Sequence, residues 1–449
     1  MRMSGQISKK ICVIGGGLAG SELSFQLAKA GFFVSLYEPR LSGLKLDKAH
    51  ESNELAELVC SNSLRSNALH NAAGLLKQEL RLYGSLLISL ADKYAVPAGD
   101  ALAVSRHDFS RAVTETIKSI PNIKLIPKEF KGLKNAMSFF DAVCVCAGPL
   151  ASNDLVMELK ELVGSDSLYF YDAIAPLIEA DSVDMEVCFR ASRYKDQIAG
   201  DYVNCPLSRE EYYNFIEELK KGDKAPLHEG DEGIFFRGCM PIEVMAEDAM
   251  DTLLNGPMRG DGLIDPRTGK APYAAVQLRQ DDLCCSIYNV VGFQTRLKYP
   301  EQDRIFRTIP GLSKAKFLRY GSMHRNTFIK ASECIQDKVF LAGQLSGVEG
   351  YIDAIASAVY VSQSVSALLG KTPFEFHDCS AIASLRRYIL NCPADKFQPM
   401  KINLGLLPPL TDEEKKQIGK KDRHHRSRLF MAERSINCIE KILAKNKNI

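Results

Sequence analysis

The chain has 449 residues, of which 46% are hydrophobic, so it can bury a large core and is expected to form two or three packed units. This composition excludes an intrinsically disordered protein. The 57 lysine and arginine residues are almost balanced by 55 acidic residues, which gives a formal charge of +2. A nucleic acid would therefore have to bind a local basic patch, because the surface as a whole is not basic.

The 13 cysteines are odd in number and irregularly spaced, in a chain far too long for a disulfide scaffold. This pattern indicates reduced thiols. The closest pairs, Cys144/Cys146 and Cys284/Cys285, do not have the spacing of a zinc site. The eight histidines form no H-E-x-x-H motif. The sequence therefore predicts no metal site.

No uninterrupted apolar run reaches the roughly 18 residues that a membrane span requires. The apolar run at residues 11–14 is too short for a signal peptide, because the glycines at 15–17 end it at once. We therefore expect a cytoplasmic protein with no membrane partner.

The first unit along the chain is a strand, a glycine-rich turn, a helix and a second strand. Residues 11–14 form a β-branched run, a helical pattern ends at Gly31, and residues 32–37 form a second apolar run. A unit of about 30 residues has the size of a nucleotide-binding βαβ motif.

The turn in this unit contains Gly15-x-Gly17-x-x-Gly20. The first glycine permits a tight turn, the second lets a pyrophosphate approach the backbone, and the third lets the helix lie close to the strand. The free N–H groups at the start of the helix then face the phosphates. Glu38 ends the second strand and is placed to bind a ribose hydroxyl. The predicted dinucleotide contacts in the turn are Gly15, Gly16, Gly17, Leu18, Ala19 and Gly20.

A second signal near the end of the chain favours FAD over NAD. Residues 339–343 form a buried strand that ends in glycine, and residues 347–350 precede a helix whose start could face the pyrimidine edge of a flavin. No second G-x-G-x-x-G motif occurs, which disfavours a pair of dinucleotide domains. Further predicted FAD contacts are Ala147, Gly148, Gly343, Gln344, Gly347, Val348, Glu349, Gly350 and Tyr351.

We predict an α/β fold: a doubly wound, Rossmann-like FAD-binding domain built from both ends of the chain, with a smaller α+β insertion domain. In the middle of the chain, short alternating runs such as 274–278 and 285–291 are separated by Gly and Pro, which is typical of antiparallel strands. The predicted units are residues 1–168 (FAD domain, first part), 169–323 (insertion) and 324–449 (FAD domain, second part).

Two cysteines lie in segments of small polar residues that also contain an arginine. Arg65 follows Cys60, and Arg237 precedes Cys239. A nearby cation favours the reactive thiolate, so each arginine is a candidate to activate its thiol. Taken alone, each of these cysteines fits a structural role better than a reactive one. Arg65 is also assigned to the cofactor site.

Seven segments carry a family resemblance: residues 56–67, 170–173, 238–245, 276–282, 291–295, 319–328 and 347–351. They resemble the folate- and FAD-dependent tRNA uracil-5-methyltransferases, the TrmFO family, over about residues 10–410. These segments are long enough to be specific, and they separate the chain from the related, longer MnmG flavoproteins.

The resemblance implies that 5,10-methylenetetrahydrofolate gives a one-carbon unit, that reduced FAD carries it, and that C5 of a T-loop uridine in tRNA receives it. NADH or NADPH would reduce the flavin. By position within the motifs, Cys60 corresponds to the flavin-side cysteine of the family and Cys239 to the thiol that attacks uracil. Such a thiol is needed because C5 of uracil is a poor nucleophile until a thiolate adds to C6.

Five further residues are candidates for folate or RNA binding: Gln277, Arg279, His324, Arg325 and Asn326. Arginine and glutamine suit a planar, polar heterocycle because they form paired hydrogen bonds. A solvated sheet face and a structural histidine are the alternatives.

The RNA target stays open. The chain departs from the family pattern around residues 38–41, 100, 105 and 329–330. The same chemistry on 23S rRNA, or an MnmG-like tRNA-modifying oxidoreductase, is therefore an alternative. Residues 415–428 hold seven Lys or Arg and one acid. This basic run could follow an RNA phosphate backbone, although such runs are more often simply solvated. The sequence does not predict the oligomeric state.

Overall fold

The computed structural model describes most of the chain. The described residues are 9–44, 49–164, 168–193, 200–226, 240–330, 334–393, 396–418 and 422–446, with the backbone alone for 168–173, 324, 325 and 446.

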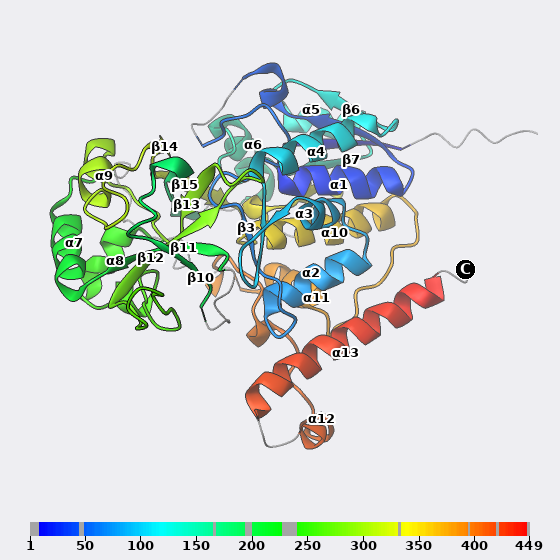
Figure 1. Cartoon of the computed structure of the whole chain (residues 1–449). Helices are drawn as coiled ribbons and strands as arrows, with labels where there is room; N and C mark the ends of the chain where they lie inside the picture. Colours follow the sequence, from blue (N-terminus) through cyan, green and yellow to red (C-terminus); the bar gives the residue numbers. More distant parts are fainter. Residues whose placement is uncertain are drawn as a thin grey trace, which may run out of the picture.

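A five-stranded parallel sheet lies at the centre of the larger lobe, and its strands come from both ends of the chain (Figure 1). In spatial order the strands are β16 (Val339–Leu341), β7 (Ala142–Val145), β1 (Lys10–Ile14), β2 (Phe33–Tyr37) and β6 (Ile123–Ile126). All neighbouring pairs are parallel. This topology confirms the predicted α/β fold class.

Both faces of this sheet are covered by helices. One face packs against α1 (Leu18–Lys29) and α10 (Tyr351–Leu368), and the other against α5 (Leu133–Phe139) and α6 (Asn153–Val163). Successive residues of β1 alternate between the two cores: Ile11 and Val13 face α1 and α10, whereas Cys12 and Ile14 face α5 and α6. A strand that is buried on both faces reads as an unbroken apolar run, as this one does.

The rest of the larger lobe is mainly helical. Its helices are α2 (Ala72–Leu82), α3 (Leu86–Lys93), α4 (Arg106–Ser119), α11 (Ala381–Asn391), α12 (Asp412–Gln417) and α13 (Arg423–Asn446). A small antiparallel sheet joins β3 (Ser63–Ser66), β5 (Ala101–Val104) and β4 (Ala95–Val96). None of the described helices is both long enough and apolar enough to cross a membrane.

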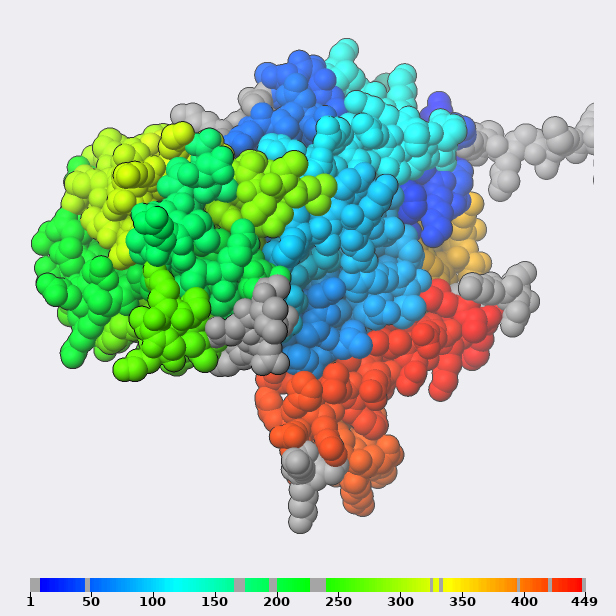
Figure 2. Space-filling model, viewed as in Figure 1, coloured from blue at the N-terminus to red at the C-terminus, as the bar shows by residue number. Residues whose placement is uncertain are grey.

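The middle of the chain forms a second lobe with its own core (Figure 2). Its six-stranded antiparallel sheet has the order β10 (Phe189–Ala191), β11 (Tyr202–Leu207), β12 (Ala274–Gln280), β13 (Ile287–Val290), β9 (Leu177–Glu179) and β14 (Phe317–Arg319). The helices of this lobe are α7 (Arg209–Lys221), α8 (Ile242–Asp248) and α9 (Tyr299–Phe306).

Two antiparallel strands, β8 (Leu168–Ile174) and β15 (Ser322–Phe328), carry the chain between the two lobes. The predicted domain boundaries at 168/169 and 323/324 fall within this pair. The boundaries themselves stay predictions.

Candidate functional site

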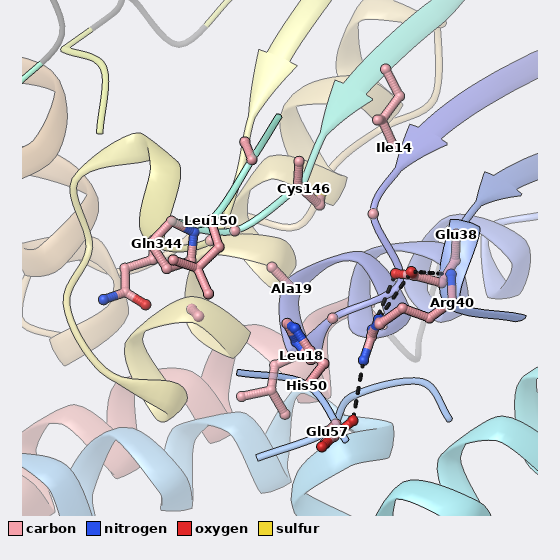
Figure 3. A pocket seen from close by; sticks show the side chains of 18 of the residues that line it. Ile14, Leu18, Ala19, Glu38, Arg40, His50, Glu57, Cys146, Leu150 and Gln344 are labelled. Atoms are coloured by element: carbon pink, nitrogen blue, oxygen red, sulfur yellow. Dashed lines mark hydrogen bonds and ion pairs between the residues drawn. The ribbon is translucent and has the colours of Figure 1, made fainter. Parts of the chain in front are cut away.

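A pocket opens where the carboxyl ends of β1, β2 and β7 meet the starts of α1 and α10 (Figure 3). In open α/β sheets, ligands bind in the crevice outside the carboxyl ends of the strands, where the strand order reverses. Eleven of the predicted cofactor residues line this pocket: Gly15, Gly17, Leu18, Ala19, Glu38, Ala147, Gly148, Gly343, Gln344, Gly350 and Tyr351.

The three glycines of the motif have different steric surroundings. Gly15 has φ +99°, and a Cβ added there would lie 2.5 Å from the carbonyl oxygen of Cys146. A Cβ on Gly20 would lie 1.8 Å from the carbonyl oxygen of Gly15. These two positions hold the turn, helix and strand together, as the motif predicts. A Cβ on Gly17 would meet nothing within 4 Å, so the backbone at Gly17 is open to the pocket.

Glu38 directly follows β2, and its carboxylate binds both the glycine-rich turn and Arg40. Its carboxylate accepts a hydrogen bond from the Gly16 N–H at 2.8 Å and bonds from the Arg40 side chain at 3.0 and 3.1 Å. Burial alone would raise the pKa of Glu38, but the charge and hydrogen bonds of Arg40 lower it below the usual value. Glu38 is therefore ionised, and a ribose hydroxyl would share its oxygens with Arg40.

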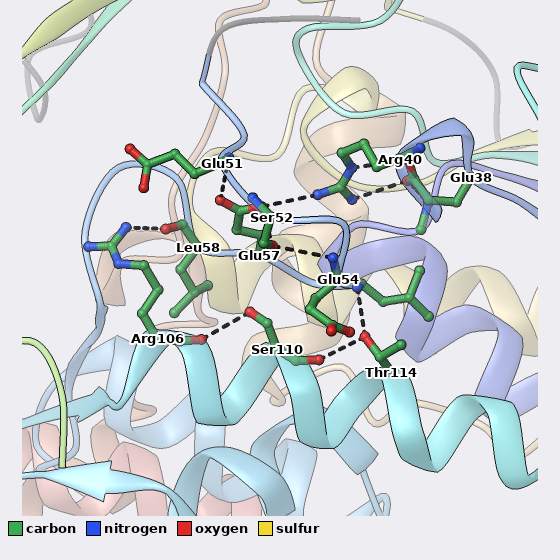
Figure 4. A network of polar contacts seen from close by, with 12 residues as sticks. Glu38, Arg40, Glu51, Ser52, Glu54, Glu57, Leu58, Arg106, Ser110 and Thr114 are labelled. Carbon is green, nitrogen blue, oxygen red and sulfur yellow. Dashed lines mark hydrogen bonds and ion pairs between the residues drawn. The ribbon is translucent and has the colours of Figure 1, made fainter. Parts of the chain in front are cut away.

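Glu57, which also lines the pocket, continues this network (Figure 4). The Arg40 guanidinium reaches Glu57 at 3.5 Å, and the Glu57 carboxylate accepts bonds from the N–H groups of Glu51 and Ser52 and from the Ser52 hydroxyl. These contacts shape the loop that leads to Cys60. Sequence reasoning did not assign several residues that line the pocket: Arg40, His50, Glu57 and Phe130. Arg40 alone had a signal, since it lies two residues after the predicted ribose acid.

The segment that carries the second predicted FAD signal, between β16 and α10, forms the opposite wall of the pocket. In Figure 3, Gln344 lies across Leu18 and Ala19 from the Glu38–Arg40 pair. The Gln344 amide donates to the Glu349 carboxylate at 2.8 Å, which closes the loop between β16 and α10.

Six of the predicted cofactor residues are not among the described residues that line the pocket. They are Gly16, Gly20, Arg65, Gly347, Val348 and Glu349. Their assignment to FAD stays a prediction.

Cys60 is tied to the start of α10. Its backbone N–H donates to the Tyr351 hydroxyl at 2.8 Å, and the N–H of Ser61 donates to the same oxygen at 3.2 Å. Burial raises the pKa of Tyr351, so the hydroxyl stays protonated. Cys60 is half-buried, and the preceding residue, Val59, lines the pocket. The structure thus places the backbone of Cys60 beside two residues that line the pocket, Val59 and Tyr351.

Two buried arginines hold the Cys60 loop. Arg279, on β12, donates to the Asn62 side chain at 2.8 Å and to the Ser61 hydroxyl at 2.6 Å. Arg106, at the start of α4, donates to the carbonyl oxygen of Leu58. Both arginines interact electrostatically with the Cys60 thiol. The second lobe therefore reaches the Cys60 loop through Arg279.

Arg65 has different neighbours from those expected. Its guanidinium lies 3.4 Å from the Asp353 carboxylate and 3.5 Å from the carbonyl oxygen of Ile402. The role of Arg65 toward Cys60 stays a prediction, whereas Arg106 and Arg279 both bind the loop around Cys60. Sequence reasoning missed Arg106, because no local pattern marks it and its ion-pair partner, Asp281, lies far away in the sequence.

The second predicted thiol, Cys239, lies outside the described residues, as does Arg237. The described chain resumes at Met240, and the N–H of Ile242 donates to the carbonyl oxygen of Gln294 at 2.8 Å. The segment that follows Cys239 is therefore fixed to the second lobe.

The remaining predicted substrate residues divide into two groups. Gln277 is buried on β12, and its amide donates to the Asn204 side chain at 2.9 Å. His324, Arg325 and Asn326 are consecutive residues of β15, on the strand pair between the lobes. Their contacts with folate or RNA stay predictions.

Comparison with known proteins gives one consistent relationship. Residues 10–371 match the family model of glucose inhibited division protein A. The protein from Natranaerobius thermophilus named "Methylenetetrahydrofolate--tRNA-(uracil-5-)-methyltransferase TrmFO" is 46% identical over 433 residues, which cover 94% of this chain and 98% of the relative. The protein of the same name from Lactobacillus gasseri is 44% identical over 449 residues, 98% of this chain and 99% of the relative.

The fold also resembles a solved structure. Aquifex aeolicus GidA in its form I crystal has a TM-score of 0.67 and 14% identity, covering 97% of this chain and 76% of GidA. At this identity, the likeness concerns the fold alone.

Proposed function

Because this chain belongs to the TrmFO family of methylenetetrahydrofolate--tRNA-(uracil-5-)-methyltransferases, we propose that it forms 5-methyluridine in the T loop of tRNA. The proposed one-carbon donor is 5,10-methylenetetrahydrofolate, the cofactor is FAD, and NADH or NADPH is the reductant. One observation carries the proposal: Tyr351, at the start of α10, holds the backbone of Cys60 at the edge of the dinucleotide pocket.

The described residues of the pocket fit FAD. The open backbone at Gly17 and the start of α1 suit a pyrophosphate, and the ionised Glu38 suits a ribose hydroxyl. Gly350 and Tyr351 place the start of α10 on the same pocket. When bound, FAD would supply the carrier of the one-carbon unit and the reducing equivalents for the methyl group.

In the proposed reaction, Cys239 activates the uracil base. Its thiolate would add to C6, and the electron pair of the C5–C6 double bond would move toward the C4 carbonyl, which makes C5 nucleophilic. After C5 has received the one-carbon unit, loss of the C5 proton and departure of the thiolate from C6 would restore the double bond. The unit is still at the oxidation level of formaldehyde, so two reducing equivalents, which bound reduced FAD would supply, are needed to make it a methyl group. The thiolate addition explains why a thiol is needed, because C5 of uracil is a poor nucleophile on its own.

Cys60 would be the second thiol, on the cofactor side. The buried Arg106 and Arg279 hold the loop that carries it, through hydrogen bonds to Leu58, Ser61 and Asn62. Because Arg279 belongs to the second lobe, the Cys60 loop would be correctly placed only when both lobes are docked together.

The proposal is tested by label transfer. The purified protein is incubated with 5,10-methylenetetrahydrofolate labelled in its methylene carbon, a reductant, and either tRNA or 23S rRNA, each transcribed without modification. We expect labelled 5-methyluridine in the T loop of tRNA after digestion. Label in rRNA alone would show that the target is rRNA and not tRNA. A labelled nucleoside other than 5-methyluridine would indicate an MnmG-like modification. Absence of folate-dependent label from both RNAs would overturn the proposal.

A further inference from the structure

Three metal-ligating side chains meet where the C-terminal helix crosses the turn before α11. His377 and Cys379 belong to this turn, and Cys438 lies on α13. Their ligand atoms all lie within 4.8 Å of one another. Cys379 is buried, Cys438 is half-buried and His377 is exposed. None of the three is among the described residues that line the dinucleotide pocket.

The local geometry turns these groups toward one another. The His377 Nδ1 atom accepts a hydrogen bond from the Cys379 N–H at 3.3 Å, which holds the imidazole beside the residue that carries the first thiol. The Cys379 Sγ lies 3.9 Å from the carbonyl oxygen of Arg434. Arg434 is one helical turn before Cys438, so the Cys379 thiol faces the side of α13 that carries the second thiol.

The two elements that hold these ligands are already fixed to each other. The Glu79 carboxylate of α2 accepts bonds from the N–H groups of Ala381 and Ile382, at the start of α11, at 2.7 and 2.9 Å. The Ser435 hydroxyl of α13 donates to the same carboxylate at 2.6 Å. A cation would therefore find its ligands held in place by the fold, and little chain entropy would be lost on binding.

Two sulfurs and one imidazole form a donor set that prefers Zn²⁺ over oxygen-binding cations such as Mg²⁺ and Ca²⁺. Zinc bonds of about 2.3 Å to sulfur and about 2.0 Å to nitrogen place ligand atoms roughly 3.5 Å apart, so the cluster needs only a small contraction. We propose that His377, Cys379 and Cys438 bind Zn²⁺, with water in the fourth position on the exposed side of His377.

Zinc at this position would clamp α13 to the turn before α11. Both thiols would lose their protons on binding, and the two thiolates would balance the charge of the ion. Metal that binds only the folded chain raises its stability with metal concentration. The spacing of the ligands along the chain gave no zinc motif, because Cys438 comes from a distant helix.

The test uses the full-length protein, reduced and freed of metal. Zinc affinity is measured by competition with a chromophoric chelator, and Co²⁺ is used as a spectroscopic probe. We expect one Zn²⁺ per chain and a Co²⁺ complex with thiolate charge-transfer absorption in the near ultraviolet. Cys438→Ser and His377→Ala should each weaken binding at least tenfold. His377 is exposed, so its replacement should leave the fold intact even if the cysteine variant does not fold.

Two matched variants serve as controls, Cys284→Ser at an exposed cysteine and His107→Ala at an exposed histidine. Both should bind zinc as the wild type does. Absence of zinc uptake by the reduced, folded wild type would overturn the proposal, and so would equal uptake by His377→Ala and His107→Ala. A disulfide between Cys379 and Cys438 that persists in reductant would also overturn it. Because the readout is metal binding, the result is independent of the proposed methyl transfer.

Discussion

The hydroxyl group of Tyr351 accepts hydrogen bonds from the backbone N–H groups of both Cys60 and Ser61, at 2.8 and 3.2 Å. Tyr351 is the first residue of α10, and it lines the dinucleotide pocket. One phenol thus connects the wall of the cofactor pocket to the loop that carries the first predicted thiol, although the two segments lie at opposite ends of the chain.

Replacing Tyr351 by Phe should slow methyl transfer by up to about thirtyfold, because two backbone N–H groups lose a hydrogen bond worth roughly 1 kcal/mol each. The rate of 5-methyluridine formation under single-turnover conditions is the measurement. Tyr388→Phe is the matched control, since that hydroxyl donates to the carbonyl oxygen of Gln398 at an exposed site. An equal rate for the Tyr351 variant and the control would show that the contact does not position Cys60 for the reaction.

Two glycine substitutions in the same turn should have different effects. Gly17→Ala should fold normally but lose most of its FAD, because its added Cβ points into open space in the pocket. Gly20→Ala should be destabilised, because its Cβ would lie 1.8 Å from the carbonyl oxygen of Gly15. Flavin content and thermal unfolding of the flavin-free proteins separate these effects. If the Gly17 variant retained its full flavin content, this result would show that the pyrophosphate does not bind at this turn.

The Arg106–Asp281 ion pair should be important for stability. Its side chains are only 3% exposed, and the bidentate bonds of 2.9 Å join α4 to the end of β12. Asp281→Asn leaves Arg106 as an uncompensated buried charge, which should cost about 3–5 kcal/mol in the free energy of unfolding. Urea denaturation measures this loss. In the exposed Lys134–Glu161 pair, Glu161→Gln should have no measurable effect, and a similarly small effect for Asp281→Asn would contradict the predicted role.

Glu79 should make stability depend on pH. Burial raises the pKa of Glu79 to about 7, although hydrogen bonds from Ser435, Ala381 and Ile382 lower it in part. In the unfolded chain the pKa is about 4.3. The folded state therefore binds the proton more tightly, so this contribution is complete below about pH 4 and is lost as the pH rises to about 7.

The measurement is the free energy of unfolding of the wild type and of Glu79→Gln between pH 4.5 and 8. The stability of the wild type relative to the variant should fall up to about pH 7 and then stay constant. A difference that does not change with pH would show that Glu79 titrates normally in the folded protein.

The parts of the fold that sequence reasoning predicted well have local signals. The glycine turn between β1 and α1, the end of α1 before Gly31, and β16 before α10 each combine an apolar run with glycines that adopt positive φ. Their sequence pattern is contained within a few residues, so it could be read without knowledge of the rest of the fold.

The parts of the site that the sequence did not predict depend on contacts between residues far apart in the chain. Arg106 and Asp281 lie 175 residues apart in the sequence, and Arg279 reaches Asn62 across 217 residues. A single arginine or aspartate has no local pattern that names its partner. For the same reason the sequence predicts Arg65, which is close to Cys60 along the chain, as its cation, whereas Arg106 and Arg279 bind the loop from distant positions.

The central claim is that a thiolate of this chain activates a uracil for methylation at C5. It is tested most directly by the amount of labelled 5-methyluridine that Cys239→Ala forms in tRNA from labelled 5,10-methylenetetrahydrofolate, per bound flavin. Cys284→Ser, at an exposed cysteine, is the control. We predict that the Cys239 variant binds FAD but forms no 5-methyluridine, whereas the control is fully active. Methylation by the flavin-loaded Cys239 variant at the rate of the control would contradict the account.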